Sequence, residues 1–483
     1  MDRVIEQLCG ALGASAVLRG ADVQARSAGS WGPPRQLVAD VLVRPTDTAG
    51  VAAALEVCHA NHQPVVAHGG LTGLVDGAWA ERDEVVLSLE LMNNIEAIDP
   101  IGRTMTVQAG VPLQTVQERA ASYGLMFPLD LGARGSATVG GNAATNAGGN
   151  RVIRYGMTRD SILGIEAVMA DGTVVSSMNS MIKNNAGYDL KQLFIGSEGT
   201  LGIITRLVLR LRQQPASQDT AWVAVESFDK VTSFLAHMDK ALGGTLSAFE
   251  VLWQDFYRLV TTPPAKSAAP LGRDHAFYVL VEGLGGNQQR DSERFEAALT
   301  SAFEADLIAD AALGKSQAER DAMWGIRDDV EQLLNHKPMF MFDVSLAITD
   351  MEAYVIGLRA RLAARWPEHH LYVFGHLGDG NLHLGISAGN AEGEACHDVE
   401  AIVYAPLQAI GGSVSAEHGI GLEKKTYLHL SRSETELALM RQLKKTLDPR
   451  GILNPGKIFD LAAPPRGHDT DLDDAAPARK ASA

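Results

Sequence analysis

The sequence predicts an α+β protein with at least two domains, and three observations support this. The chain has 483 residues, more than one hydrophobic core normally organises. Short apolar runs alternate with amphipathic stretches from residue 38 to 212 and again after residue 220, which is the pattern of successive strands and helices. Between these regions lies the polar stretch RQQPASQDT at 212–220. Its proline and its lack of apolar periodicity predict a domain boundary.

The first region predicts a βαβ unit followed by further strands. VLVRP at 41–45 reads as a strand, the next fifteen or so residues as a helix, and PVVAHGG at 64–70 as a second strand entering a glycine turn. An Asp-Gly turn within 165–175 predicts a hairpin. Additional elements are expected as strands at 84–92, 104–111 and 201–211, as a helix at 112–125, and as a short amphipathic helix at the N-terminus.

The second region repeats the same alternation. Strands are predicted at 221–228 and 276–286, each followed by a helical stretch, at 229–242 and 288–305. Residues 435–459 predict a helix followed by a segment broken by proline and glycine. The tail from 461 to 483 lacks periodicity and is expected to be disordered.

Composition excludes several kinds of protein. Hydrophobic residues make up 46% and charged residues 21% of the chain, as in ordinary globular proteins. The formal charge of −16 argues against nucleic acid or an anionic membrane as the main partner. Cys9, Cys58 and Cys396 form no CxxC pattern, which favours a reducing compartment. No apolar run approaches ~20 residues and no secretory core is present, so we expect no transmembrane segment and a cytoplasmic protein.

The most informative stretch is GHLGDGNLH at 375–383. Apolar runs on both sides of the GDGN turn predict two short strands in a hairpin, with His376 roughly opposite His383. Leu382, Leu384 and Ile386 should share one face of the second strand, so that His383 points to the other face.

A second motif, SAEHGIG at 415–421, adds Glu417 and His418. Two imidazoles and one carboxylate form a three-ligand divalent-metal site with an open position, and the neighbouring imidazole could move a proton. The alternative is a hairpin whose histidines bind no metal, with a solvated Glu-His pair elsewhere.

Glycine-rich segments carry a separate signal. PVVAHGGLTG at 64–73 follows a strand, so its backbone N–H groups could form a nest for a pyrophosphate. It is neither GxGxxG nor a P-loop, and a plain tight turn is the alternative. Residues 129–150 interleave glycine with Ser, Ala and Thr, which allows close backbone approach to a large flat molecule. A third glycine-containing piece, at 188–205, includes Glu198.

These segments, in this order, resemble the D-2-hydroxy acid dehydrogenase branch of the vanillyl-alcohol oxidase-type (PCMH-type) flavoproteins. GSEGTLGIIT, GHLGDGNLH, SAEHGIG and LNPGKIF carry the resemblance, which covers about residues 38–459. The branch includes D-lactate and D-2-hydroxyglutarate dehydrogenases and the glycolate oxidase flavin subunit. The resemblance implies an N-terminal helical segment at 1–37, an FAD-binding domain at 38–212, a ferredoxin-like substrate and metal domain at 213–434, and a C-terminal helical segment at 435–460 that returns to the FAD.

The resemblance also implies which residues bind the cofactor. They would cradle the pyrophosphate, wrap the flavin, border the adenosine or lie near the isoalloxazine ring. They are Val66, Ala67, His68, Gly69, Gly70, Leu71, Thr72, Gly73, Gly77, Pro128, Gly135, Ser136, Thr138, Gly140, Gly141, Asn146, Gly148, Gly149, Glu198, Gly202, Ile204 and Asn454.

Two residues depart from the family's pyrophosphate loop. Leu71 stands where the family usually has Asn, and Asp76 where it usually has Gly. Main-chain contacts should survive Leu71, whereas a carboxylate at position 76 is unfavourable beside a diphosphate unless it points away. His68 raises covalent flavin attachment as an alternative, although FAD is usually non-covalent in this branch.

The expected mechanism combines the metal site with the flavin. His376, His383 and Glu417 would hold a divalent cation, zinc or alternatively manganese or iron, which lowers the pKa of the substrate's C2 hydroxyl. His418 would act as the base while hydride passes to flavin N5; the reverse assignment of Glu417 and His418 is the alternative. Asn381 would position the substrate or orient a ligand.

The substrate is expected to be a small 2-hydroxy acid. Arg327 in WGIRDDV occupies the position of the family's anchoring arginine, with a solvated helix arginine as the alternative. The family's KxDxSxP motif appears here with Met341 for Lys and Ala347 for Pro. This favours D-lactate-like or larger apolar D-2-hydroxy monocarboxylates. D-2-hydroxyglutarate and a role as the flavin subunit of a larger complex are alternatives.

Electrons from the reduced flavin require an external acceptor, because the sequence contains no haem or iron–sulfur motif. A quinone, an electron-transfer flavoprotein, a cytochrome and oxygen all remain open, and a homodimer is possible. An aryl-alcohol-type oxidase and a non-catalytic metal-binding protein are the competing classes.

Overall fold

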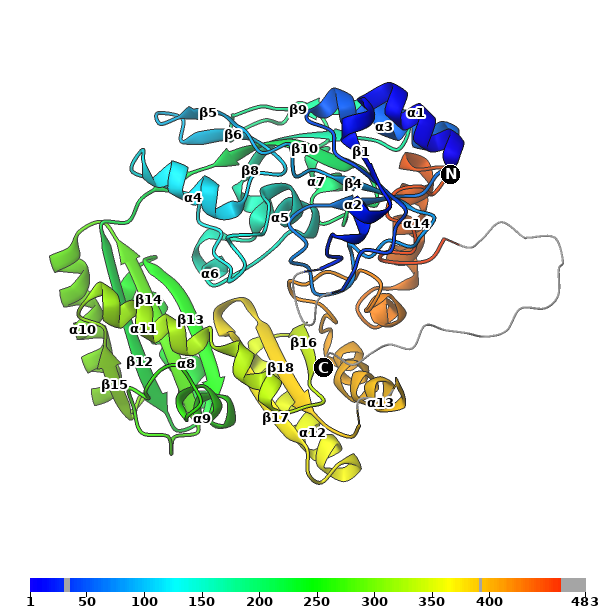
Figure 1. Cartoon of the computed structure of the whole chain (residues 1–483). Helices are drawn as coiled ribbons and strands as arrows, with labels where there is room; N and C mark the ends of the chain where they lie inside the picture. The colour runs from blue at the N-terminus through cyan, green and yellow to red at the C-terminus, as the bar shows by residue number, and fades with distance from the viewer. Residues whose placement is uncertain (30–34, 391–392, 462–483) are drawn as a thin grey trace. The chain divides into compact units, whose positions relative to one another are not determined.

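The computed structural model describes residues 1–29, 35–390 and 393–461 (Figure 1). The chain forms two compact units. Among the described residues, unit 1 comprises Met1–Gly148, Met157–Gln214 and the chain from Glu417 to residue 461, and unit 2 comprises Gly149–Gly156 and Pro215–Ala416. The tail expected to be disordered lies outside the described residues from position 462 onward. In the described part of the chain, no helix has the length and apolar character needed to cross a bilayer.

Unit 1 begins with a small four-stranded sheet. Its order is β1 (Val17–Arg19), β2 (Val41–Val43), β4 (Val85–Ser88) and β3 (Val65–His68). The predicted βαβ unit is confirmed: β2 and β3 both run parallel to β4, and α3 (Thr48–Ala60) connects them. The C-terminal segment joins this sheet, because Leu453 forms a parallel bridge with Val65.

A five-stranded antiparallel sheet forms the rest of the unit 1 core. Its order is β5 (Ile95–Asp99), β6 (Thr104–Gln108), β10 (Ile203–Arg210), β8 (Ile162–Val168) and β9 (Val174–Ser177). The hairpin predicted at 165–175 is confirmed as β8 and β9. Strand β5 was not predicted, because it is an outer strand with mostly exposed residues and lacks the apolar run of its neighbours.

The remaining elements of unit 1 are short helices, 3₁₀ turns and one two-stranded pair. The helix predicted in the C-terminal segment is α14, which starts with a capping box between Ser433 and Glu436. The elements are α1 (Asp2–Leu12), η1 (Ala14–Ala16), α2 (Ala21–Gln24), α4 (Leu113–Ala121), β7 (Leu125–Met126), α5 (Val139–Thr145), η2 (Thr158–Ser161), α7 (Lys191–Phe194), β11 (Arg212–Gln213), η6 (Lys425–Leu430) and α14 (Glu434–Leu447).

Unit 2 is built on a seven-stranded sheet whose paired strands are all antiparallel. The strands follow in the order β15 (Asp310–Leu313), β12 (Ser217–Val225), β14 (Phe277–Gly285), β13 (Leu246–Trp253), β17 (His370–His376), β18 (Asn381–Ser387) and β16 (Phe340–Ser345). The other elements are α6 (Val152–Tyr155), α8 (Phe228–Leu242), α9 (Gln254–Thr261), α10 (Gln288–Glu304), α11 (Gln317–Arg327), η3 (Val330–Asn335), α12 (Ile348–Arg365), η4 (Leu377–Asp379), α13 (Gly393–Tyr404) and η5 (Ala405–Ile410).

Helices cover both faces of this sheet. On β12, Ser217 and Asp219 bond to Asp291 and Ser292 of α10, whereas the Trp222 indole donates to the Met323 carbonyl of α11. Because alternate residues of a strand point to opposite faces, α10 and α11 lie on opposite faces. We call the face of the sheet that α11 covers the α11 face. It carries the ionisable side chains described below.

Two sequence-based expectations need correction here. Only the first part of the predicted linker at 212–220 connects the two regions. Strand β12 already starts at Ser217, which is paired with Gly285 of β14. The predicted hairpin exists as β17 and β18, but His376 is not opposite His383. Phe374 is paired with His383, because the short helix η4 and Gly380 lengthen the turn beyond a two-residue loop.

A short segment links the glycine-rich part of the sequence to unit 2. Residues Gly149–Gly156, which contain α6, belong to this unit although the flanking residues belong to unit 1. Arg151 forms an ion pair with Glu282, with Nε and Oε1 3.1 Å apart, and the Arg154 guanidinium donates to the carbonyls of Thr245 and Leu284. We call residues 149–156 the inserted segment.

Candidate functional site

A row of ionisable side chains crosses the α11 face of the seven-stranded sheet. Glu250 on β13 is paired with His376 on β17, and His383 on β18 is paired with Asp343 on β16. Since Phe374 is also paired with His383 and lies two residues before His376, all four side chains share one face. The two carboxylates are at most 1% exposed, so they need partners within the protein.

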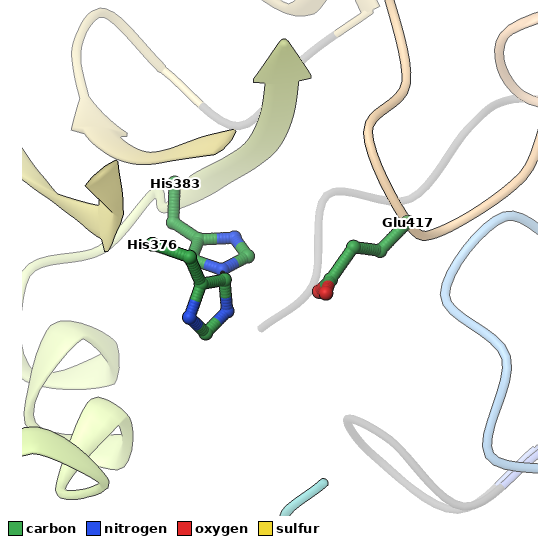
Figure 2. Close-up of side chains that lie close together, drawn as sticks. All are labelled: His376, His383 and Glu417. Carbon is green, nitrogen blue, oxygen red and sulfur yellow. The ribbon is translucent and has the colours of Figure 1, made fainter. Parts of the chain in front are cut away.

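The three predicted metal ligands come together. One potential ligand atom from each of His376, His383 and Glu417 lies within 4.8 Å of the others, and Figure 2 shows the three side chains converging. The Nε2 atoms of the two histidines are 3.4 Å apart. Two imidazoles and a carboxylate with spare coordination positions suit a divalent cation, so these residues fit the metal that the sequence predicts.

Glu250 sets the orientation of His376. The Nδ1 atom of His376 donates to Glu250 Oε1 at 2.7 Å, which leaves the Nε2 lone pair directed toward His383. Burial alone would raise the pKa of Glu250, but the nearby His376 and Arg327 outweigh it and lower that pKa. Glu250 was not predicted. The signal was a single acidic residue within the otherwise apolar run LSAFEVLW.

Arg327 lies beside the histidines rather than in solvent. Its Nε donates to Glu250 Oε2 at 2.8 Å, and its Nη2 lies 3.3 Å from His376 Nε2. The residue is 8% exposed and ends helix α11. The alternative of a solvated helix arginine is therefore wrong.

Asn381 presents an amide without a hydrogen-bond partner. It is 3% exposed, and both amide atoms of its side chain lack a partner within the described residues. Asn381 lies two residues before His383, so the two side chains are on the same face of β18. An orphaned buried amide has a substantial desolvation cost, and this geometry fits a polar ligand next to the histidines.

Met341 occupies the same face farther along β16. It is paired with Gly385, is 36% exposed and lies two residues before Asp343. Leu333 and Met339 pack over Gly385, so the surroundings of Met341 on this side are apolar.

Strand β16 also anchors the chain just before Glu417. Ser345 and Ser413 exchange two backbone hydrogen bonds of 3.1 and 2.7 Å, and the Ala416 N–H donates to Asp343 Oδ2 at 3.0 Å. Asp343, like Glu250, was not predicted as a site residue. Within unit 1, a Cβ at position 148 would meet the Glu417 carboxylate, so a larger residue there would displace the Glu417 side chain.

The predicted cofactor-binding glycines fall into two groups. Gly70 and Gly140 approach other backbone so closely that a Cβ would overlap with Ser136 or Ala109 respectively, and a Cβ on Gly202 would meet the Phe194 ring at 2.6 Å. By contrast, nothing lies within 4 Å of a Cβ at Gly73, and one at Gly77 would meet only Glu198 Oε2 at 3.9 Å. The first group shapes the loops, and the second leaves open backbone for a ligand such as FAD.

The two departures in the pyrophosphate loop have a common backbone explanation. Leu71 has φ 58° and Asp76 has φ 54°, a left-handed conformation that Asn and Gly adopt most readily. The Asp76 carboxylate forms an ion pair with Arg35 at 2.6 Å, and the Arg35 guanidinium also stacks over Trp79. The loop therefore keeps its left-handed turns, and the extra carboxylate has a cationic partner.

His68 stabilises this loop through a hydrogen bond. Its Nε2 donates to the Ala78 carbonyl at 2.8 Å, and the residue is 3% exposed. Burial lowers the pKa of His68 to about 4, although the Ala78 carbonyl opposes the shift. A neutral imidazole with an engaged Nε2 has a structural role, which argues against covalent flavin attachment at this atom.

Other residues of the predicted cofactor set connect the segments of unit 1. Thr138 caps helix α5 through the Gly141 N–H, and Asn146 ends that helix in a left-handed conformation. Asn454 accepts a hydrogen bond of 2.9 Å from the Ala67 N–H, which holds the C-terminal segment beside the pyrophosphate loop. Ile204 is buried in β10.

Comparison with known families matches both parts of the chain. The description "FAD linked oxidases, C-terminal domain" matches residues 214–458, and "FAD binding domain" matches residues 39–177. The chain belongs to the FAD-linked oxidase family. The FAD-binding domain of this family matches residues 39–177, so FAD is the cofactor and the chain is a flavin-dependent oxidoreductase.

Individual relatives place the chain within this family. It is 39% identical over 421 residues to D-2-hydroxyglutarate dehydrogenase of Xanthomonas citri pv. viticola, covering 86% of this chain and 88% of the relative. It is also 39% identical over 424 residues to the mitochondrial D-2-hydroxyglutarate dehydrogenase of Bos taurus, covering 88% and 77%. The resemblance to the D-2-hydroxy acid dehydrogenase branch is thus confirmed.

A solved structure confirms the fold class. The structure of p-cresol methylhydroxylase with bound substrate aligns with a TM-score of 0.75 at 16% identity, covering 95% of this chain and 97% of that chain. At this identity the similarity concerns the fold alone. The chain therefore has the α+β fold of the vanillyl-alcohol oxidase type that the sequence predicts.

Proposed function

We propose that this chain oxidises a D-2-hydroxy acid to the 2-oxo acid, using FAD and a divalent metal held by His376, His383 and Glu417. The observation that carries the proposal is the convergence of these three side chains beside Arg327. When bound, FAD supplies a two-electron acceptor and the cation supplies a Lewis acid for the substrate's C2 oxygen.

The residues of the chain then have separate tasks. Arg327 would anchor the substrate carboxylate, since a guanidinium matches a carboxylate in a two-pronged geometry, and the unpartnered Asn381 amide would complete its orientation. His418 would accept the hydroxyl proton as the C2–H bond breaks and the hydrogen leaves as hydride. The product is the 2-oxo acid. The reverse assignment, with Glu417 as base and His418 as ligand, is the alternative.

Glu250 supports this assignment of tasks without touching the substrate. Its carboxylate holds both His376 and Arg327, so one buried anion orients a metal ligand and the proposed substrate anchor together. Carboxylate–histidine–metal arrangements of this kind fix the tautomer and strengthen the ligand.

The surroundings of Met341 favour a substrate with an apolar side chain. A methionine that faces Gly385, which Leu333 and Met339 cover, offers no cation for a second carboxylate. We therefore propose D-lactate-like or larger apolar D-2-hydroxy monocarboxylates. D-2-hydroxyglutarate is the second candidate, because two close relatives carry that name.

A substitution separates these two substrate classes. Met341→Lys restores the cation of the family motif and should improve kcat/KM for D-2-hydroxyglutarate relative to D-lactate. If the unaltered enzyme already prefers D-2-hydroxyglutarate strongly, the apolar substrate class is wrong, although the reaction type stands.

Zinc is the proposed metal, with manganese or iron as alternatives. Electrons would leave to an external acceptor: a quinone, an electron-transfer flavoprotein, a cytochrome or oxygen. We also propose a cytoplasmic enzyme that acts as a homodimer or as the flavin subunit of a larger complex. Cell fractionation and co-purification of partner subunits test these points.

Anaerobic flavin bleaching tests the reaction itself. D-2-hydroxy acids should bleach the bound flavin and L-enantiomers should not, and removal of the metal by chelation should slow bleaching strongly. His418→Ala should keep the flavin and the metal but reduce the flavin at least about a hundredfold more slowly. Full bleaching rates after complete metal removal would contradict the metal role, and full rates in His418→Ala would contradict the base.

A further inference from the structure

One carboxylate of unit 1 holds the backbone that follows His418. Glu198 Oε1 accepts a hydrogen bond of 2.8 Å from the Ile420 N–H, and Oε2 accepts one of 2.8 Å from the Gly421 N–H. Both oxygens of Glu198 thus bind the chain two and three residues beyond His418. Hydrogen bonds from backbone N–H groups to a carboxylate are among the stronger ones in proteins.

Val75 constrains the same loop. The Leu422 N–H donates to the Val75 carbonyl at 2.9 Å, and a Cβ on Gly421 would overlap with that carbonyl. Gly419 and Gly421 have φ values of 84° and 52°, which few residues other than glycine adopt. The backbone after His418 is therefore fixed by contacts with both Val75 and Glu198.

Glu198 is itself held by its backbone. Its φ is 51°, a left-handed conformation that is unfavourable for residues other than glycine. Its N–H donates to the Ala144 carbonyl at 2.8 Å, and its carbonyl accepts from Asn454 Nδ2 at 2.6 Å. A residue kept in an unfavourable conformation by bonds at its N–H, its carbonyl and its side chain is typical of functional sites.

We propose that Glu198 is a positioning residue for Glu417 and His418, and that its carboxylate serves this loop instead of bordering the adenosine of FAD. The inference rests on the proposed roles of Glu417 and His418 in the reaction. A base must reach its proton within hydrogen-bond distance, and a site that is loose by about 1 Å loses much of its activity. By holding the backbone at Ile420 and Gly421, Glu198 would keep Glu417 and His418 in position.

Glu198→Gln is the decisive variant. The amide keeps one acceptor but turns an NH₂ group toward a backbone N–H, so one of the two bonds is lost without loss of volume. In holoenzyme, we expect the rate constant of anaerobic flavin reduction by D-lactate, or by the best substrate found, to fall about 10- to 100-fold. The FAD content and the substrate dissociation constant should stay unchanged.

Glu84→Gln is the matched control. Glu84 is a buried carboxylate of unit 1 that, like Glu198, accepts a hydrogen bond from a backbone N–H, here that of Glu81. Desolvation raises the pKa of both carboxyl groups, although backbone N–H groups oppose the shift in each. Its loop does not carry Glu417 or His418, so its flavin reduction rate should match that of the unaltered enzyme. Should Glu198→Gln not fold, Glu198→Asp retains the charge with a shorter reach and is expected to show a smaller fall in rate.

A double-mutant cycle with His418→Ala separates this inference from the proposed reaction. If Glu198 acts through His418, Glu198→Gln should slow His418→Ala little further. An additional 10- to 100-fold loss, or loss of FAD from Glu198→Gln with full rates in the molecules that retain it, would overturn the inference. If His418→Ala alone keeps the full rate, the base assignment fails, whatever Glu198→Gln does.

Discussion

The two units solve the problem of building a site in different ways. In unit 1 the predicted cofactor-binding segments rely on backbone: glycines such as Gly70 and Gly140 packed against other main chain, left-handed turns and main-chain hydrogen bonds. In unit 2 the α11 face of the sheet relies on buried charge, with Glu282 paired to Arg151 and Glu250 paired to Arg327. Unit 1 should therefore be sensitive to added atoms, and unit 2 to removed charges.

This contrast fits what each unit is proposed to hold. A large cofactor with a diphosphate can be bound by many N–H groups presented by close-packed loops. A small acid and a cation offer few atoms, so each contact must be strong and directed. Five predictions follow, beginning with the largest expected effect, and the first four test this contrast directly.

Gly70→Ala should abolish FAD binding. The added methyl group would overlap with the Ser136 carbonyl, so the two glycine-rich loops could not keep their present contact. The flavin-to-protein absorbance ratio of the purified protein measures the effect. Gly10→Ala, in helix α1 with nothing within 4 Å of the new methyl group, is the control and should retain full FAD. A fully yellow Gly70→Ala protein would show that the loops tolerate added atoms after all.

Glu282→Gln should lower the free energy of unfolding by about 3 kcal/mol, because it leaves the charge of Arg151 without its buried partner. Glu282 is fully buried and also accepts hydrogen bonds from Trp324, Ser247 and Gln218. Urea unfolding measures the loss. Asp306→Asn removes the exposed ion pair with Lys230 and should change the midpoint very little.

The same pair predicts a pH dependence. Burial alone would raise the pKa of Glu282, but Arg151 and the hydrogen-bond donors outweigh it and hold that pKa below the ordinary 4.5. A lowered folded-state pKa means that this stabilisation is present above pH 4.5 and is lost as pH falls through the folded-state value. The difference in stability between the unaltered protein and Glu282→Gln should therefore shrink below pH 4.5. A difference that grows there would contradict the sign.

Leu71→Asn should stabilise the protein by about 1 kcal/mol, since asparagine adopts the left-handed conformation at lower cost than leucine. Leu71 has φ 58°. The thermal unfolding midpoint should rise, and FAD should remain bound because the main chain does not change. Leu74→Asn, at an exposed leucine of the same loop without positive φ, should give no gain.

Cys58 should resist thiol reagents in the folded protein. Burial raises the pKa of its thiol to about 12, so almost no thiolate exists at pH 8. Cys9 and Cys396 are partly exposed and should react with a chromogenic disulfide, and all three should react after denaturation. Rapid reaction of Cys58 would show that the core of unit 1 opens readily.

Local features of the sequence predicted the hairpin that carries His376 and His383 well. Turn residues between two apolar runs and the alternation of Leu382, Leu384 and Ile386 are properties of neighbouring residues, and the structure has both strands and the predicted facing. The register was wrong because η4 occupies the turn. Whether these side chains bind metal stays a prediction, as do the cofactor-binding residues.

The sequence alone could not predict contacts between residues that lie far apart in the chain. Glu250 meets His376 across 126 positions of sequence, and the apolar run around Glu250 gave no sign of which strand it would join. The expectation that the Asp76 carboxylate is unfavourable in the loop missed its ion-pair partner for the same reason, because Arg35 lies 41 positions away. In each case the missing information was a strand pairing or a salt bridge between distant segments.

The inserted segment has a practical consequence for anyone who wishes to divide the protein. Because residues 149–156 belong to unit 2 but are flanked by unit 1, no single cut in the gene yields unit 2 with all its parts. A fragment that starts at Pro215 would carry Glu282 without Arg151 and the Leu284 carbonyl without Arg154. Truncation at the apparent boundary should give an unstable product, whereas supplying residues 149–156 as a tethered peptide should restore it.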